Sequence, residues 1–151
     1  MGGGIVIRNQ EGDIFLAEAC FLGRGTSLMA ESIALLRGLE LCKEHNLFGV
    51  EVEIDCKLLF QVLTTSLLGP WSIFSILVAI RDLLPTISCS FRHIFREANS
   101  VADFLSKHAS FSRNSMAYSA SSIPVPLRGL VRLDQQEILA QPNIREDMKA
   151  R

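Results

Sequence analysis

The sequence lacks the closely spaced cysteines that are typical of small proteins stabilised by disulfides or by a bound metal. Its four cysteines are widely spaced and no two form a C-x-x-C pair, which argues against a zinc site or a redox pair. We expect them to be buried, reduced thiols. There is also no excess of charge: 15 basic and 16 acidic residues leave a net charge of −1. Nucleic-acid binders usually carry a basic excess, so any such site must come from local placement of charge.

Long apolar runs are absent as well. The longest apolar stretch, residues 67–80, is interrupted by a Gly-Pro pair. It is shorter than the ~18 to 20 residues that span a bilayer. Met1 is followed by three glycines, where a secretory leader would have a basic and then an apolar segment. We therefore expect a protein that does not cross a membrane and is not secreted, and that works in the nucleus or the cytoplasm.

What is present is an alternation of strand and helix patterns within a one-domain length of 151 residues. The order β-β-α-β-α-α-β-α predicts an α/β domain in which helices cover a mixed sheet. Pro85 is expected to end the sixth element. The predicted segments are a hairpin of strands 4–8 and 14–21, helix 27–46, strand 49–54, helix 56–63, helix 72–84, strand 86–95 and helix 100–110. We assign residues 1–112 to this domain. Residues 113–151 are assigned to a Ser/Pro-containing tail, with a linker at 119–126 and a weak helix at 127–139.

Three carboxylates are candidates for chemistry, and each has a plainer alternative. Glu31 lies in the middle of the apolar face of the first helix, where a carboxylate is costly unless it is paired or binds a metal. Asp55 ends a strand, and it could instead cap the helix that follows. Asp103 lies near a helix N-terminus, where a pair with Lys107 four residues later would explain it equally well.

The sequence also resembles a known family. The matching stretches are G-G-G-I-V-I-R-N at 2–9, A-E-S-I-A-L at 30–35, E-I-D at 53–55, and F-R-H-I followed by R-E-A-N-S-V-A-D at 91–103. Together they resemble the ribonuclease H-like domains of plants, many of which descend from retroelement reverse transcriptases. The resemblance covers roughly residues 2–112.

The resemblance implies a ribonuclease H-like mixed sheet flanked by helices, and Mg²⁺-dependent endonucleolytic cleavage of the RNA strand in RNA/DNA hybrids. Two Mg²⁺ ions would activate a water and stabilise the leaving oxygen. By position in the motifs, the catalytic and metal-binding residues would be Glu31, Asp55 and Asp103. The expected nucleic-acid contacts are Arg92, Arg96 and Asn99, although Asn99 is also a helix cap by pattern.

His93 and Trp71 could each have a functional or a structural role. His93 stands in a strand pattern between apolar residues, so we expect it to be packed and not catalytic. Trp71 could stack on a base. We favour the alternative that it anchors the start of its helix in the core.

One part of the family pattern has no counterpart in this sequence. The family has a strand ending in V-D-G or similar before the glycine run, and this strand supplies the first catalytic Asp from the centre of the sheet. Without it, the hairpin could close against strand 49–54, another chain or the tail could fill the gap, or no stable domain would form. Three functions stay open: a hybrid endonuclease, which the resemblance implies, a catalytically inactive nucleic-acid-binding or interaction module, and a relic without a function of its own.

Overall fold

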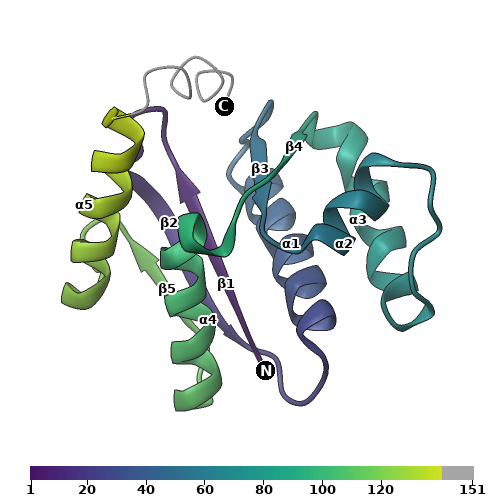
Figure 1. The fold of residues 1–151 in the computed structure, drawn as a ribbon, viewed down its shortest axis with the longest axis horizontal. Helices are drawn as coiled ribbons and strands as arrows, with labels where there is room; N and C mark the ends of the chain where they lie inside the picture. The colour runs from purple at the N-terminus through teal and green to yellow at the C-terminus, as the bar shows by residue number, and fades with distance from the viewer. Residues whose placement is uncertain (141–151) are drawn as a thin grey trace.

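The computed structural model describes residues 1–140 and contains two small sheets (Figure 1). The first sheet holds β1 (Gly2–Arg8), β2 (Ile14–Phe21) and β5 (Met116–Ser119), all antiparallel, in the order β1-β2-β5. Between β1 and β2, Asn9 Oδ1 accepts hydrogen bonds from the amides of Glu11 and Asp13. Gly12 completes the turn with a φ of 84°, which glycine adopts without strain.

The second sheet pairs β3 (Glu51–Ile54) with β4 (Ser90–His93) in parallel. Two parallel strands need a crossover. Here it consists of α2 (Lys57–Thr64), the short 3₁₀ turn η1 (Trp71–Ile73) and α3 (Phe74–Ile87). Among residues 1–140 no strand joins the two sheets, so the hairpin does not close against β3.

Helix α1 (Ser27–Glu44) packs against both sheets. Towards the first sheet, Ala34 and Leu41 bury Ile5. Towards the crossover helices, Leu39 and Cys42 pack with residues of α3. The N-terminus of α1 is capped by Thr26, whose hydroxyl accepts a hydrogen bond from the amide of Met29, as the pattern predicted.

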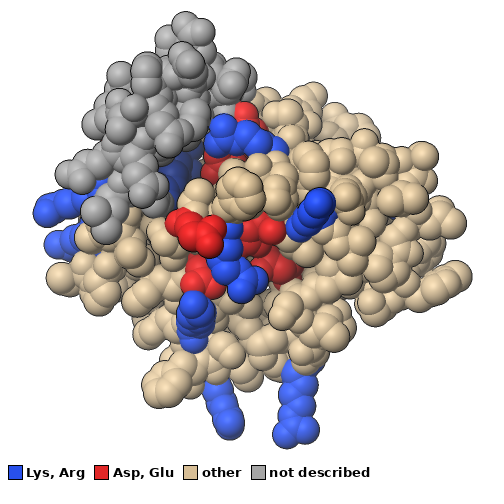
Figure 2. All heavy atoms as spheres, viewed as in Figure 1, with Lys and Arg blue, Asp and Glu red and all other residues tan. Residues whose placement is uncertain are grey.

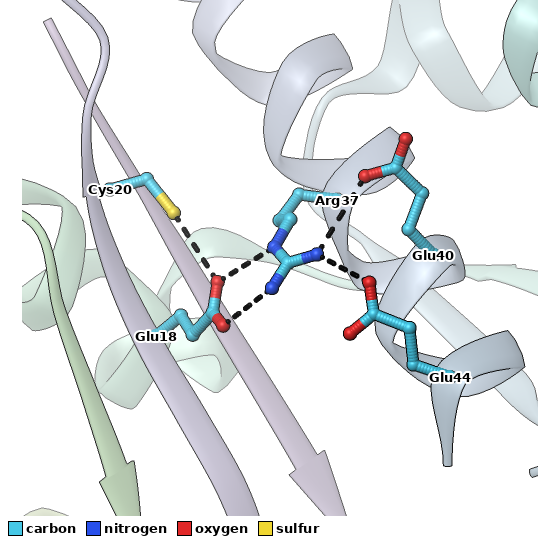
Figure 3. Close-up of polar contacts among 5 residues, drawn as sticks. All are labelled: Glu18, Cys20, Arg37, Glu40 and Glu44. Atoms are coloured by element: carbon cyan, nitrogen blue, oxygen red, sulfur yellow. Dashed lines mark hydrogen bonds and ion pairs between the residues drawn. The ribbon is translucent and has the colours of Figure 1, made fainter.

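An ion-pair network also ties α1 to the hairpin (Figure 3). Arg37 of α1 forms a two-pronged contact with Glu18 of β2, with both N–O distances at 3.0 Å. Glu40 and Glu44 flank the same guanidinium at 3.8 Å and 2.9 Å. The carboxylates raise the pKa of Arg37, chiefly through the bond to Glu18. The network thus fixes the rotation of α1 relative to β2.

Helix α4 (Ser100–Ser112) covers the other face of the first sheet at very close range. A Cβ atom at Gly2 would lie 2.1 Å from the carbonyl oxygen of Ser106, and one at Gly4 would lie 1.9 Å from that of Ala102. The glycine run is therefore needed because any side chain at these positions would collide with the backbone of α4.

The C-terminal part contains a strand that the sequence patterns did not reveal. Residues assigned to the tail supply this strand, β5, and also α5 (Val125–Ala140), which is close to the weak helix expected at 127–139; residues 141–151 lie outside the described part. Tyr118, Ile123 and Leu127 are buried against α4 and β2. A four-residue strand such as β5 is too short for a clear period-2 pattern, which is why it was missed.

Two other expectations were wrong. Pro85 does not end its helix, because α3 continues to Ile87 and stops at Ser88, which has a left-handed φ of 53°. The last turn tolerates the proline because only one internal hydrogen bond is lost there. Trp71 is not in the core: its side chain is 88% exposed and contacts Phe74 at a ring-centroid distance of 5.4 Å, while Ile73 fills the buried position.

The eight elements from β1 to α4 follow the predicted order. The four cysteines are all unpaired thiols, and Cys42 is fully buried. None of the helices in residues 1–140 is sufficiently long and apolar to cross a membrane.

We predict that the C-terminal helix contributes to the stability of the domain. Leu127→Ala should lower the free energy of unfolding by about 2–5 kcal/mol, because Leu127 is completely buried. Urea unfolding followed by circular dichroism measures this change. The control is Phe111→Ala, a residue 93% exposed, which should stay within about 0.5 kcal/mol of the wild type. An unchanged midpoint for Leu127→Ala would show that α5 is dispensable.

Candidate active site

Three carboxylates from separate segments line one small cavity. Glu31 comes from α1, Asp55 directly follows β3, and Asp103 comes from the first turn of α4. The cavity has a volume of about 20 Å³, and Gly3 and Gly4 of β1 form another of its walls. It therefore has room for about one water-sized species. The three residues are those that the sequence motifs singled out.

The pKa of Glu31 shows that the three carboxylates interact electrostatically. Burial, as the largest cause, and the charges of Asp55 and Asp103 together raise the pKa of Glu31 to about 7. Arg96 acts in the opposite direction and lowers it. A carboxylate with a pKa this high marks a site where negative charge is concentrated without full compensation, which is typical of functional sites.

Asp55 is oriented by Asn99. The Asn99 side-chain amide donates a hydrogen bond of 3.1 Å to Asp55 Oδ2. The parallel pairing of β3 and β4 continues for one step, with the amide of Ile94 donating to the carbonyl of Ile54, and the 3₁₀ turn η2 (Arg96–Asn99) follows. Asp55 does not cap α2: the N-cap is Cys56, which makes no side-chain capping bond.

Asp103 forms an ion pair with Lys107. Lys107, four residues later on α4, donates to Asp103 at 2.6 Å, which is the helix pair that the sequence also allowed. The side chain of Lys107 is 77% exposed, whereas that of Asp103 is 29% exposed. Solvent screens such a pair strongly, so Lys107 neutralises the inner edge of the cavity only in part.

The candidate nucleic-acid contacts do not act as one group. Arg92 of β4 is held by two carboxylates of β3: its Nε lies 3.0 Å from Glu51 Oε1 and its terminal nitrogen contacts Glu53. Its guanidinium is thus engaged within the sheet. Arg96 is exposed and Asn99 faces the cavity. In Figure 2, acidic and basic side chains gather in the middle of one face of the molecule.

Phe95 is a candidate that the sequence patterns did not identify. Its side chain is 77% exposed and it directly precedes Arg96. The predicted strand 86–95 would have placed Phe95 within the sheet, but β4 ends at His93, so Phe95 lies beyond the last ladder pair. His93 lies against two rings, with centroid distances of 5.8 Å to Phe60 and 6.1 Å to Phe95, as expected for a packed histidine.

The donor set fits magnesium in chemistry. Mg²⁺ prefers oxygen ligands and keeps several of its waters, so a few carboxylates suffice. The uncompensated charge around Glu31 fits a cation in the same way. Among residues 1–140, however, no group of three or more His, Cys, Asp or Glu side chains is arranged to hold a metal ion directly. The residue types of Glu31, Asp55 and Asp103 thus fit a magnesium ion, whereas their arrangement in the described residues is not a direct ligand set.

We predict that Glu31 destabilises the fold at high pH. Its folded pKa of about 7 exceeds the ordinary value of 4.5, so the folded protein binds a proton more tightly than the unfolded chain does between these values. Stability should fall as the pH rises from about 4.5 to 7. Glu31→Gln should remove this loss, and at pH 8 it should be more stable than the wild type by on the order of 2–3 kcal/mol.

Urea unfolding at pH 4 and at pH 8 tests this. At pH 4 the two proteins should be nearly equal, because Glu31 is protonated in both states. Glu11→Gln, a change at an exposed position in the turn between β1 and β2, is the control. A Glu31→Gln variant that is equally stable or less stable than the wild type at pH 8 would contradict the prediction.

Comparisons with known proteins agree with this arrangement. A family model described as reverse transcriptase-like matches residues 2–109. Among solved structures, the ribonuclease H1 of the halophilic archaeon Halobacterium salinarum is similar: the identity is 26%, the TM-score is 0.67, and the match covers 75% of this chain and 86% of that one. No curated protein matches significantly. With 108 of its residues inside the matched range, the chain belongs to the reverse transcriptase-like family and has a ribonuclease H-like fold.

Proposed function

We propose that this domain binds RNA/DNA hybrids and cleaves the RNA strand with Mg²⁺, using Glu31, Asp55 and Asp103. One observation carries the proposal: three carboxylates that are far apart in the sequence line a single cavity. The family and the fold support it. We place the activity inside the cell, in the nucleus or cytoplasm, because four unpaired cysteines suit a reducing compartment.

The chemistry assigns a role to each residue. Bound Mg²⁺ would supply Lewis-acid activation of water and stabilise the leaving oxygen, with two ions expected. Glu31, Asp55 and Asp103 would hold it through carboxylate oxygens and retained waters. A cation there would lower the pKa of Glu31, since it offsets the charges of Asp55 and Asp103. Asn99 would keep the Asp55 carboxylate in its orientation.

Substrate contacts are proposed for the rim of the cavity. Arg96 is exposed beside the carboxylates and can approach a phosphate. Phe95, with its exposed ring next to Arg96, can stack on a base or pack against a sugar. Arg92 is a weaker candidate because Glu51 and Glu53 already hold its guanidinium.

A second function, a nucleic-acid-binding or interaction module without catalysis, is favoured by a different observation. No three side chains of residues 1–140 are arranged to hold an ion directly, and Lys107 already contacts Asp103. Such a module would bind a hybrid without cleaving it, and Asp55→Asn would leave its affinity unchanged.

We predict Mg²⁺-dependent cleavage of a labelled RNA/DNA hybrid. Glu31→Gln, Asp55→Asn and Asp103→Asn should each abolish it, because each removes a charged ligand. Asn99→Ala should lower the rate by roughly 10–100-fold, since it frees Asp55 to rotate. Gel analysis of the cleaved RNA strand measures these rates. Asp82→Asn, an exposed change on α3, is the matched control.

A readout independent of turnover separates the two functions. Mg²⁺ should raise the melting temperature of the wild type at pH 8 more than that of Asp55→Asn. Cleavage together with this shift supports the endonuclease. Folded protein that binds the hybrid, does not cut it and gains no stability from Mg²⁺ would establish the binding module instead.

We predict that Phe95 contributes to hybrid binding. Phe95→Ala should weaken the affinity by roughly tenfold, because a stacked ring contributes about 1–3 kcal/mol. Fluorescence anisotropy with a labelled hybrid at fixed salt measures the dissociation constant. Phe111→Ala removes another exposed ring, near the C-terminal end of α4, and should leave the dissociation constant unchanged. Equal affinities for the two variants would exclude Phe95 from the interface.

A further inference from the structure

The crossover between β3 and β4 exposes a set of apolar side chains within an uncharged segment. Residues 58–80 contain no Asp, Glu, Lys or Arg, and they include most of α2, all of η1 and the first half of α3. Beyond the end of α2, the exposed large apolar side chains of this segment are Leu67, Leu68, Trp71, Phe74 and Val78. We call these five side chains the crossover patch.

The crossover patch is one continuous surface. The rings of Trp71 and Phe74 lie 5.4 Å apart between centroids, and Val78 is one turn beyond Phe74 on the same face of α3. Arg81, a further turn along this face, donates a hydrogen bond of 2.9 Å to the carbonyl of Leu67. This bond holds the connection that carries both leucines against α3. The crossover patch lies at the end of the molecule away from α5 (Figure 1).

The exposed area of the crossover patch is large for a single chain. Trp71 is 88% exposed and Leu68 is 75% exposed. Because a whole aromatic side chain covers roughly 150–250 Å², the five exposed fractions together amount to an area on the order of 600 Å². The largest apolar patch of a typical monomer is about 300–600 Å², and a stable interface buries about 800 Å² on each partner. With the exposed hydroxyl side chains of Ser66, Ser72 and Ser75, the crossover patch approaches the size of such an interface.

The absence of charge decides which kind of partner fits the crossover patch. Nucleic acid is bound through Lys and Arg contacts to phosphates, and helices that lie on a membrane surface carry Lys and Arg beside their apolar face. Residues 58–80 contain neither, and the guanidinium of Arg81 is already engaged by the carbonyls of Val62 and Leu67. Figure 2 shows only tan atoms at the α3 end of the face in view. The matching partner is therefore an uncharged apolar protein surface.

We propose that the crossover patch is the interface of a two-fold symmetric homodimer. A second copy presents a surface of the same size that is equally free of charge, and a two-fold contact uses the same surface of both copies. No charged group is then buried without a partner, and no second apolar surface is left open. The stripe of Trp71, Phe74 and Val78 lets α3 of one copy pack across α3 of the other.

Trp71 is the expected centre of the binding energy in this dimer. It is the largest side chain of the crossover patch and the most exposed one, and buried tryptophans are frequent hot spots of protein interfaces. No residue of the crossover patch lines the small cavity that holds Glu31, Asp55 and Asp103. Dimerisation through α3 therefore leaves the candidate active site of each copy open.

Sedimentation equilibrium of the full chain, from about 1 µM to 1 mM, tests the oligomeric state. The wild type should change from a monomer to a species of twice the mass, with a dissociation constant in the micromolar range. Leu68→Asp should weaken dimerisation at least tenfold, because the two-fold contact then brings two like charges into an apolar interface. The matched control is Phe111→Asp, the same kind of change at an exposed side chain of α4 outside the crossover patch, which should dimerise like the wild type.

The fluorescence of Trp71 provides a second readout that reports on this surface alone, because the chain contains a single tryptophan. The exposed indole of the monomer should emit at long wavelength. The emission of the wild type should move to shorter wavelength as the protein concentration passes through the dissociation constant. Leu68→Asp keeps Trp71 and should lose this shift, whereas Phe111→Asp should retain it. Both substituted side chains are exposed, so the urea midpoints of the two variants should match that of the wild type.

Several outcomes would overturn the proposal. A protein that is still monomeric at ~1 mM does not pair through the crossover patch. A dimer that persists in Leu68→Asp, or that leaves the emission of Trp71 unchanged, uses another surface. A shift that appears only when neutral lipid vesicles or an RNA/DNA hybrid are added would identify a lipid or a nucleic acid as the partner. Short-wavelength emission from the dilute monomer would show that the chain itself covers Trp71. Dimerisation is measured without nucleic acid or Mg²⁺, so its failure leaves the proposed cleavage untouched.

Discussion

The packing of α1 is the contact on which the rest of the structure depends. Residues 1–140 contain no strand that links β1 to β3, so hydrogen bonding alone does not hold the two sheets together. The apolar surface of α1 does so, with Ala34 and Leu41 against the hairpin and Leu39 against the crossover helices. Arg37 and Glu18 fix its rotation. The relative position of the two sheets is therefore set by the packing of apolar side chains and not by a shared ladder of hydrogen bonds.

The geometry of the candidate site depends on this packing of α1. Glu31 is on α1, Asp55 ends the second sheet, and Asp103 is on the helix that covers the first sheet, so the site lies where the two halves meet. Glu31 holds its proton to about pH 7 because it is partly buried and near two other carboxylates. Such a cluster costs stability in the absence of a cation, which is a common property of functional sites.

Much of this could be predicted from the sequence. The spacing of apolar residues gave the order of elements through α4, since period and turn chemistry are local properties. The carboxylates were identified from motif resemblance, and the glycine run has its reason in the approach of α4 to Gly2 and Gly4. Local patterns failed where distant contacts decide: β5 pairs with β2 across the chain, and Trp71 is exposed because Ile73 occupies the core position.

The sequence by itself determined the order of elements from β1 to α4, the family resemblance and the choice of Glu31, Asp55 and Asp103 as candidates, because each depends on residue types a few positions apart. Only the tertiary structure decided that Glu31, Asp55 and Asp103 share a cavity, that Arg92 is engaged by Glu51 and Glu53, and that Phe95 is exposed. It also showed a cavity of about 560 Å³ lined by β1, α1 and β3. These are relations between segments far apart in the chain, and they are fixed by packing and strand pairing.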